Sequence, residues 1–203
     1  MNQDNLLPEN CTLLFSQKKI RKSIKKIAKK LNKDFANKQV VYLTIMNGGM
    51  IFAADLAKKL NLDMEMDYVQ VSRYGTETTG GQLIWKHQCE TILKDKHVIL
   101  VDDIFDEGYT LMAVDEWCKE QGAKTVTSVV LVSKNHNRGY ADFAVDYSGI
   151  KVEDLYIFGY GMDFQEKLRH LRDIYYLVPD RERNRSEGKS DLKQNFSLFE
   201  ENS

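Results

Sequence analysis

The stretch that decides the fold is Val98-Ile99-Leu100-Val101-Asp102-Asp103-Ile104-Phe105-Asp106-Glu107-Gly108-Tyr109-Thr110-Leu111. It begins with four consecutive apolar residues, a pattern typical of a short strand that is buried on both faces of a sheet. Two adjacent carboxylates follow, then a third, then a glycine and a hydroxyl where a helix is expected to begin. We therefore predict a strand over 98–101, a polar loop, and a helix over about 110–121 that ends at Gly122.

The residues of this stretch suit a sugar phosphate. Backbone N–H groups at the start of a helix bind anions, and a glycine lets the chain approach a phosphate closely. Adjacent carboxylates can accept hydrogen bonds from two vicinal sugar hydroxyls, or reach a Mg²⁺ ion through water. The pattern predicts a phosphate at 106–110 and sugar hydroxyls at Asp102 and Asp103. A strand followed by an acidic, N-capped helix is the simpler interpretation.

Strands and helices alternate around this stretch. We expect strands over 40–46, 64–71 and 125–132, and a helix over 50–60 after the turn Asn47-Gly48-Gly49. This alternation predicts an α/β fold with a parallel sheet flanked by helices, in which ligands bind at the carboxyl ends of the strands.

The chain is expected to form a single domain over residues 1–178, with its core at 40–178. Pro8 and Pro179 nearly bracket that body, and no linker interrupts it. Residues 179–203 mix charges without apolar periodicity, so we expect a mobile charged tail. The apolar residues near its end leave a docked short helix as the alternative.

Composition excludes several classes of protein. With 203 residues, 42% hydrophobic residues and a formal net charge of −1, the bulk charge favours no particular partner. The apolar runs are far shorter than the roughly 20 residues of a membrane helix. The three cysteines form no CxxC pair, and the N-terminus lacks the pattern of a signal peptide. We therefore expect a cytoplasmic protein without a membrane partner.

One predicted helix, over about 17–33, is strongly basic. Ile20, Ile24, Ile27, Ala28 and Leu31 form a narrow apolar stripe, and Ser16 is the expected N-cap. The other faces carry nine basic residues and no acidic one: Lys18, Lys19, Arg21, Lys22, Lys25, Lys26, Lys29, Lys30 and Lys33. The simpler interpretation is a solvated face on a packed helix. The alternative is a surface that binds a membrane or a nucleic acid.

The stretch 98–111 resembles the phosphoribosyl pyrophosphate (PRPP) binding loop of type I phosphoribosyltransferases. Further segments from about 40 to 178 resemble the hypoxanthine-guanine branch of that family. One position departs from the pattern, because the family usually has threonine where this chain has Glu107. We expect the Glu107 carboxylate to point away from the phosphate, since charge repulsion would otherwise weaken binding.

The resemblance implies a role for each matching residue. PRPP would be held by the loop and its flanking carboxylates: Asp102, Asp103, Asp106, Glu107, Gly108, Tyr109 and Thr110. Pyrophosphate would contact Asn47, Gly48 and Arg169, with a cis peptide expected between Asn47 and Gly48. A closing lid would begin with Ser72, Arg73, Tyr74 and Gly75. The purine site would comprise Lys134, Tyr156, Ile157 and Asp163.

The resemblance also implies the chemistry and the architecture. Asp106 would be the catalytic base, and Mg²⁺ would lie near Asp102, Asp103 and Asp163. A small hood would be built from the C-terminal part, and we assign Phe164, Leu168 and Leu171 to packing in a helix. Homo-oligomerisation, as a dimer or tetramer, is expected.

The implied reaction is a glycosyl transfer that salvages purines, converting hypoxanthine or guanine and PRPP to a nucleotide and pyrophosphate. Xanthine is a further candidate substrate. A pyrimidine is disfavoured by Lys134 and Tyr156. The alternative from another class is a PRPP-sensing regulator with the same fold, whose basic helix binds nucleic acid.

Overall fold

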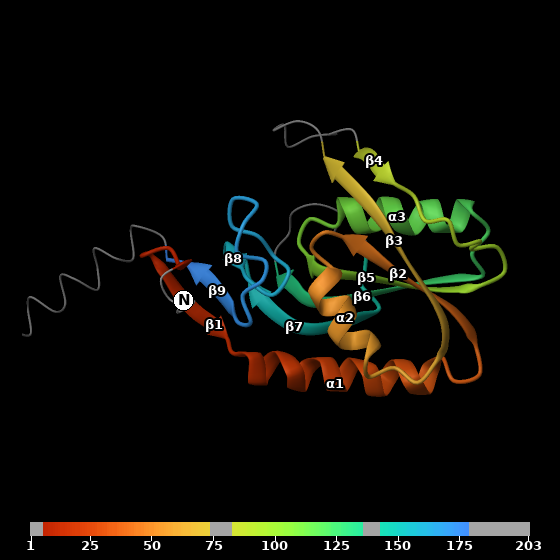
Figure 1. Ribbon diagram of the computed structural model, residues 1–203, viewed down its shortest axis with the longest axis horizontal. Coiled ribbons are helices and arrows are strands. Elements are labelled where there is room, and N and C mark those ends of the chain that lie inside the picture. The colour runs from red at the N-terminus through yellow and green to blue at the C-terminus, as the bar shows by residue number, and fades with distance from the viewer. Residues whose placement is uncertain (1–5, 74–82, 136–142, 179–203) are drawn as a thin grey trace, which may run out of the picture.

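The computed structural model describes residues 6–73, 83–135 and 143–178 of the chain (Figure 1). The predicted tail at 179–203 and the lid residues Tyr74 and Gly75 lie outside these ranges. Within them, no helix is long and apolar enough to cross a membrane.

A six-stranded sheet in the order β4-β3-β2-β5-β6-β7 forms the centre of the fold. All neighbours in it are parallel except β4, which pairs antiparallel with β3 at one edge. Its strands are β2 (Gln39–Met46), β3 (Asp63–Arg73), β4 (Leu83–His87), β5 (His97–Phe105), β6 (Thr125–Asn135) and β7 (Tyr147–Glu153). The predicted parallel α/β sheet is confirmed, with an antiparallel edge strand in addition.

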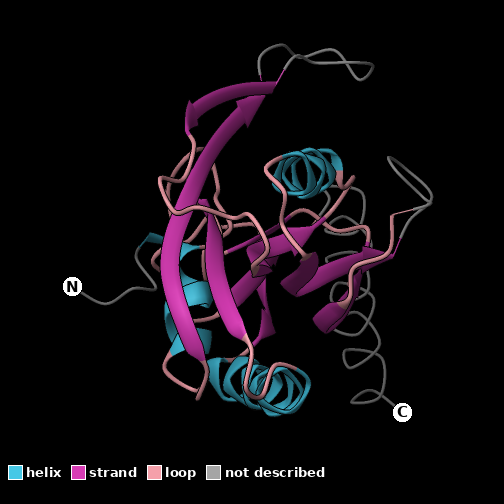
Figure 2. Cartoon of the chain, turned by 90° about the vertical axis from the view of Figure 1, so that its right-hand side faces the viewer, coloured by secondary structure: helices cyan, strands magenta, loops and turns pink. Residues whose placement is uncertain are grey.

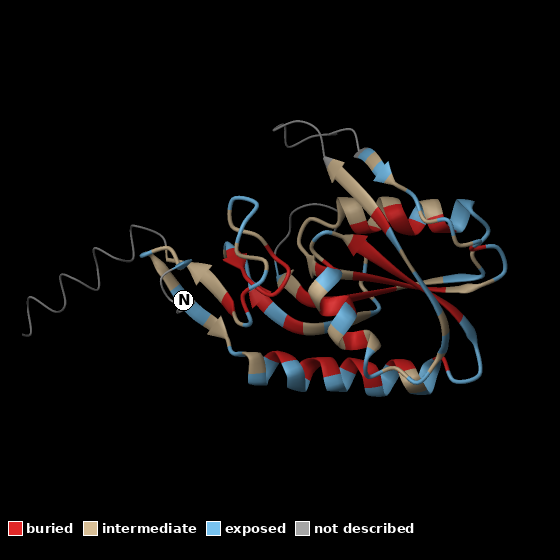
Figure 3. Ribbon diagram, in the orientation of Figure 1, coloured by how far each residue is buried: buried red, intermediate tan, exposed pale blue. Residues whose placement is uncertain are grey.

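Three helices cover the two faces of this sheet (Figures 1 and 2). α1 (Gln17–Asp34) and α2 (Met50–Ala57) pack on one face, where the predicted apolar stripe of α1 is buried. α3 (Tyr109–Glu120) covers the other face. Because both faces are covered, the central strands β2, β5 and β6 are buried on both sides, as their continuous apolar runs predicted (Figure 3).

Two central strands extend beyond their apolar runs. β5 and β6 remain paired as far as Phe105 and Ser133, so Asp102 and Asp103 lie within β5 rather than after it. Lys134 likewise lies inside β6, beside Val152 of β7. The apolar run marks only the part of each strand that is buried on both faces.

Three local predictions are wrong. Ser72 and Arg73 belong to β3, where they pair with β4 instead of starting a loop. α2 ends at Ala57, before the predicted 60. The segment around Phe164 and Leu168 forms turns instead of a helix, with positive φ at Gln165, Glu166 and Leu168.

A second, three-stranded sheet joins the two ends of the described chain. It has the order β1-β9-β8, from β1 (Cys11–Phe15), β9 (Ile174–Leu177) and β8 (Ile157–Phe158). β1 pairs antiparallel with β9, Cys11 opposite Leu177. The predicted small hood, built from the C-terminal part alone, is not confirmed, because this second sheet also contains β1 from the N-terminal part.

Candidate active site

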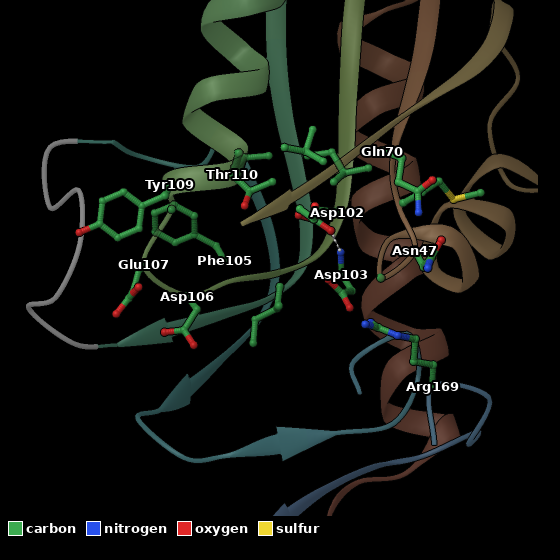
Figure 4. A pocket seen from close by; sticks show the side chains of 18 of the residues that line it. Asn47, Gln70, Asp102, Asp103, Phe105, Asp106, Glu107, Tyr109, Thr110 and Arg169 are labelled. Atoms are coloured by element: carbon green, nitrogen blue, oxygen red, sulfur yellow. Dashed lines mark hydrogen bonds between the residues drawn. The ribbon is translucent and has the colours of Figure 1, made fainter. Parts of the chain in front are cut away.

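A cavity of about 610 Å³ opens at the carboxyl ends of β2 and β5, beside the start of α3 (Figure 4). Its lining includes all of the predicted PRPP residues, together with Asn47, Gly48 and Arg169. The structure thus brings together the predicted phosphate, sugar and pyrophosphate residues. Sequence reasoning missed three polar residues that also line it: Gln70, Lys86 and Glu166.

The start of α3 is shaped by Gly108. This residue is the N-cap of the helix and has φ +82°, a conformation that L side chains rarely adopt. A Cβ at this position would lie 2.7 Å from the Phe105 ring. Glycine therefore lets the loop turn sharply over Phe105 and leaves the first amides of α3 at the cavity, where they can bind an anion.

The adjacent carboxylates of β5 are packed closely together. The Asp103 backbone N–H donates to Asp102 Oδ1 at 2.9 Å, and the Asp103 side chain is buried. Burial raises the pKa of Asp102 well above its ordinary value, and the neighbouring Asp103 charge raises it further. Burial also raises the pKa of Asp103, against the opposing effect of Arg169. A cation or sugar hydroxyls at this pair would favour its charged form.

Two glycines allow two loops to approach Asp103 of β5 closely. A Cβ on Gly48 would lie 2.5 Å from Asp103 Oδ2, and a Cβ on Gly161 would lie 2.4 Å from the Gly48 carbonyl oxygen. Gly161 also has φ +107°. A cis peptide bond occurs in the first of these loops, between Met46 and Asn47, one bond earlier than predicted. Gly161 escaped sequence reasoning because nothing local reveals its close approach to Gly48.

A second cavity of about 280 Å³ adjoins the first and shares Asp103, Asp106 and Arg169 with it. The predicted purine residues Lys134, Tyr156, Ile157 and Asp163 all line it. Tyr156 is 51% exposed, and its ring meets Phe164 edge to face, with centroids 6.1 Å apart. An exposed aromatic face beside a cavity can stack on a planar ring.

Lys134 of the second cavity forms an ion pair with Asp106, which lines both cavities. Its Nζ lies 2.6 Å from Asp106 Oδ2 and 3.8 Å from Asp154 Oδ1, and the Lys134 side chain is only 10% exposed. β6 carries the lysine and the loop after β5 carries Asp106, so neighbouring strands place a donor beside an acceptor. Such a charged pair presents one fixed pattern of hydrogen-bonding groups to a ligand.

The predicted magnesium trio is not assembled. Arg169 donates from one nitrogen to the Gly161 carbonyl at 2.7 Å, and its other nitrogen lies 2.8 Å from Asp163 Oδ1. Asp163 is thus engaged by Arg169, apart from Asp102 and Asp103. Across the described ranges, no three His, Cys, Asp or Glu side chains form a group that could hold a metal ion. Asp163 as a third magnesium ligand stays a prediction, and in this arrangement its carboxylate is paired with Arg169.

Glu107 lines the first cavity, yet its carboxylate points away from Thr110 and from the pair on β5 (Figure 4). This direction agrees with the expectation from charge repulsion. The loop can then offer main-chain amides to a phosphate without a facing carboxylate.

Two carboxylates, a glycine turn and a helix start at the carboxyl edge of a parallel sheet are typical of the place where α/β proteins bind anionic ligands. The family model of the phosphoribosyl transferase domain matches residues 12–166, and the chain belongs to this family. This membership makes the chain a glycosyltransferase.

Similar proteins align with most of this chain. A hypoxanthine-guanine phosphoribosyltransferase of Bacillus subtilis is 30% identical over 168 residues, covering 82% of this chain and 93% of the relative. A hypoxanthine-guanine-xanthine phosphoribosyltransferase of Tritrichomonas foetus is 32% identical, covering 87% of this chain and 97% of the relative. The crystal structure of a hypoxanthine phosphoribosyltransferase from Staphylococcus aureus superposes with a TM-score of 0.78 at 30% identity, covering 83% and 92%.

Proposed function

We propose that this chain transfers the phosphoribosyl group of PRPP to hypoxanthine or guanine, releasing pyrophosphate. One observation carries the choice of base: Lys134 and Asp106 lie 2.6 Å apart where the two cavities meet. A 6-oxopurine carries an O6 acceptor, and the free base protonated at N7 carries an N7–H donor on the same edge. The lysine can donate to O6 while the aspartate accepts from N7–H. The names of the similar proteins support the same substrate class.

PRPP would occupy the larger cavity. The amides at 106–110 would hold the 5′-phosphate, and Asp102 and Asp103 would accept from the ribose hydroxyls. The amides around Asn47 and Gly48, with Arg169, would hold the pyrophosphate. Each group would then contact main-chain donors, an arginine or carboxylates that suit its charge.

The residues have separate tasks in the reaction. Breaking the anomeric C–O bond places negative charge on the leaving pyrophosphate, which Arg169 and the amides stabilise as it develops. The purine N9 attacks the anomeric carbon as the bond to pyrophosphate breaks, and the proton on N7 passes to Asp106. Tyr156 stacks on the base, and the main chain of Ile157 meets the base edge.

The carboxylate pair on β5 fits Mg²⁺. Magnesium is often held by one or two carboxylates together with substrate phosphates. Burial raises the pKa of both carboxyls, and a bound cation would favour their charged form. Asp102 and Asp103 would hold the ion. When bound, Mg²⁺ supplies positive charge to the diphosphate leaving group.

Base selection follows from the same lysine. An ammonium group only donates, so it suits O6 of hypoxanthine, guanine or xanthine and opposes the N6 amino group of adenine. A polar site built for one partner can reject the wrong one by several orders of magnitude.

A spectrophotometric assay with PRPP and Mg²⁺ across hypoxanthine, guanine, xanthine and adenine tests the proposal. Hypoxanthine and guanine should give nucleotide, and adenine should give none above background. Turnover of adenine alone, or of no base, would refute the proposed function. Assembly as a dimer or tetramer and a cytoplasmic location stay predictions, which light scattering and cell fractionation can test.

A further inference from the structure

A third cavity, of about 380 Å³, lies between α1 and β7, away from both cavities of the proposed active site. The side chains that matter in it are Phe15, Lys19, Lys22, Ser23, Lys26 and Lys151. None of them lines the other two cavities. The proposed function therefore leaves this part of the basic helix without a role.

Four lysines surround this cavity without a counter-charge. Lys19, Lys22 and Lys26 follow at spacings of three and four on one face of α1, and Lys151 approaches from β7. No ion pair joins any of the four to a carboxylate within the described ranges. The Lys19 ammonium instead lies 5.7 Å from the centre of the Phe15 ring. Like charges held this close favour an anion with several negative charges.

Ser23 provides a second, independent observation. It stands on the same face of α1, is only 7% exposed, and lines the cavity. Its Oγ is the one buried side-chain N or O atom of the described chain that has no hydrogen-bond partner. Leaving a buried hydroxyl without a partner costs about 1–3 kcal/mol. A ligand in this cavity can supply the missing partner.

Gly149 lets β7 approach that hydroxyl closely. A Cβ at this position would lie 2.7 Å from Ser23 Oγ and 2.7 Å from the Leu131 carbonyl oxygen. Any larger residue would clash with the hydroxyl and with the backbone of β6. The floor of the cavity thus combines a buried hydroxyl with the bare backbone of a glycine.

We propose that this cavity binds a small, soluble anion bearing several phosphate charges, a phosphorylated metabolite, with Ser23 Oγ donating to a phosphate oxygen. A recessed site with a buried hydroxyl at its floor fits a compact ligand. A nucleic acid would lie across the outer surface of α1 and engage its remaining basic residues as well. Because the cavity shares no residue with the proposed active site, this proposal can fail while the proposed function stands.

Isothermal titration calorimetry of the full chain with inorganic tripolyphosphate tests the proposal. The pair Lys22→Ala and Lys26→Ala removes two charges from the cavity. The matched pair Lys25→Ala and Lys29→Ala removes two charges from α1 outside it. We expect the first pair to weaken one binding event by about tenfold or more, and the control pair by less than about twofold.

Two outcomes would overturn the proposal. If neither pair changes the titration, tripolyphosphate binds only at the proposed active site. If both pairs weaken binding equally, α1 acts as a diffuse charged surface, and a single-stranded RNA oligonucleotide retained in proportion to charge would identify nucleic acid as its ligand.

Ser23→Ala separates binding from folding. Removing the hydroxyl should weaken the same binding event by about two- to tenfold, the usual effect of one hydrogen bond. The melting temperature should not fall, because the variant also removes an unpartnered buried group. An unchanged affinity would show that the hydroxyl does not contact the ligand, contrary to the proposal.

Discussion

Asp106 and Lys134 form an ion pair at the junction of the two cavities. Their proposed roles differ, so Asp106 is tested through kcat and Lys134 through KM for the base. Asp106→Asn keeps the size of the side chain but removes the proton acceptor. We expect kcat to fall by about 10²-fold or more, with little change in KM for PRPP. Glu107→Gln, next in the chain, is the matched control and should change kcat little, because its carboxylate points away from Thr110 and from the pair on β5. Unchanged turnover in Asp106→Asn would remove this residue from the mechanism.

Lys134→Ala should act on the base and not on PRPP. Loss of the O6 donor should raise KM for hypoxanthine and guanine by about tenfold or more, since a bond to a charged group is lost. KM for PRPP should stay within about twofold. Steady-state kinetics with each substrate varied in turn decide this, and Lys124→Ala, just before the other end of β6, is the control. Guanine bound as well as before would place the base pocket elsewhere.

Gly161→Ala tests the close approach of the loops around Asp103. The added Cβ would meet the Gly48 carbonyl oxygen at 2.4 Å, so the pyrophosphate loop must shift. We expect a loss of about 1–3 kcal/mol in the free energy of unfolding and a higher KM for PRPP. Gly122→Ala is a matched control, because it has a similar φ of +81° but its nearest neighbour would lie 3.4 Å away. Equal effects on KM in the two variants would contradict the role of the close approach.

At the scale of the element, the start of α1 depends on a distant residue. Ser16 is the N-cap, as predicted, but its side chain makes no capping hydrogen bond. The Gln17 backbone N–H instead donates to Asp173 Oδ1 at 2.6 Å, from the segment just before β9. This bond fixes the first turn of α1 to the second sheet.

Asp173→Ala should therefore destabilise the protein by about 0.5–2 kcal/mol, the usual cost of a lost cap. Ser16→Ala should cost far less, because no bond from that side chain is lost. Urea unfolding of both variants measures the difference directly. A larger effect from Ser16→Ala would reverse the assignment of the cap.

The sequence predicted some elements and not others for a physical reason. β2, β5 and β6 were predicted because strands buried on both faces need continuous apolar residues, as in Val98–Val101. β1 and β9 are short and partly exposed, and each depends on a partner far along the chain, so neither has a local pattern that reveals it.

The same contrast holds for the candidate site. The residues at 102–110 were predicted because one loop carries them all. Gln70 and Lys86 were missed because single polar residues on half-exposed strands look like ordinary surface. The pairing of Arg169 with Asp163 was missed for another reason, since sequence shows which charges are present but not which ones meet.

At the scale of the whole molecule, the acidic pair on β5 makes stability depend on pH. The folded-state pKa of Asp102 is raised, so the folded chain holds a proton that the unfolded chain releases near pH 4. The contribution of Asp102 to the free energy of unfolding is therefore fully present below the unfolded pKa. It is lost as pH rises through the folded pKa. A cation bound at Asp102 and Asp103 should restore the lost stability, because it favours their charged form.

Asp102→Asn should accordingly stabilise the folded protein at neutral pH, by about 0.5–2 kcal/mol, although it removes a proposed ligand-binding group. The gain should shrink as pH falls toward 4, because the folded aspartate becomes protonated and the unfolded one is then about half protonated. Thermal unfolding from pH 4 to pH 8 checks both statements. A variant that is less stable than the wild type at pH 7 would contradict the predicted cost of burying the charged Asp102 beside Asp103.

The pairing of β1 with β9 has a consequence for the order in which the protein is made. Cys11 leaves the ribosome long before Leu177, its partner in the second sheet. At about 5–20 residues per second, the first strand waits roughly 8–33 s for the last. The six described strands of the central sheet are all made once Glu153 is made. In contrast, β8, which carries Ile157 of the proposed base site, can pair only when β9 has been made. On the nascent chain, the proposed phosphate loop at 106–110 is therefore complete before the proposed purine site. A chain that stops before residue 174 would keep the loop but would lack β9, with which β8 pairs beside the purine site.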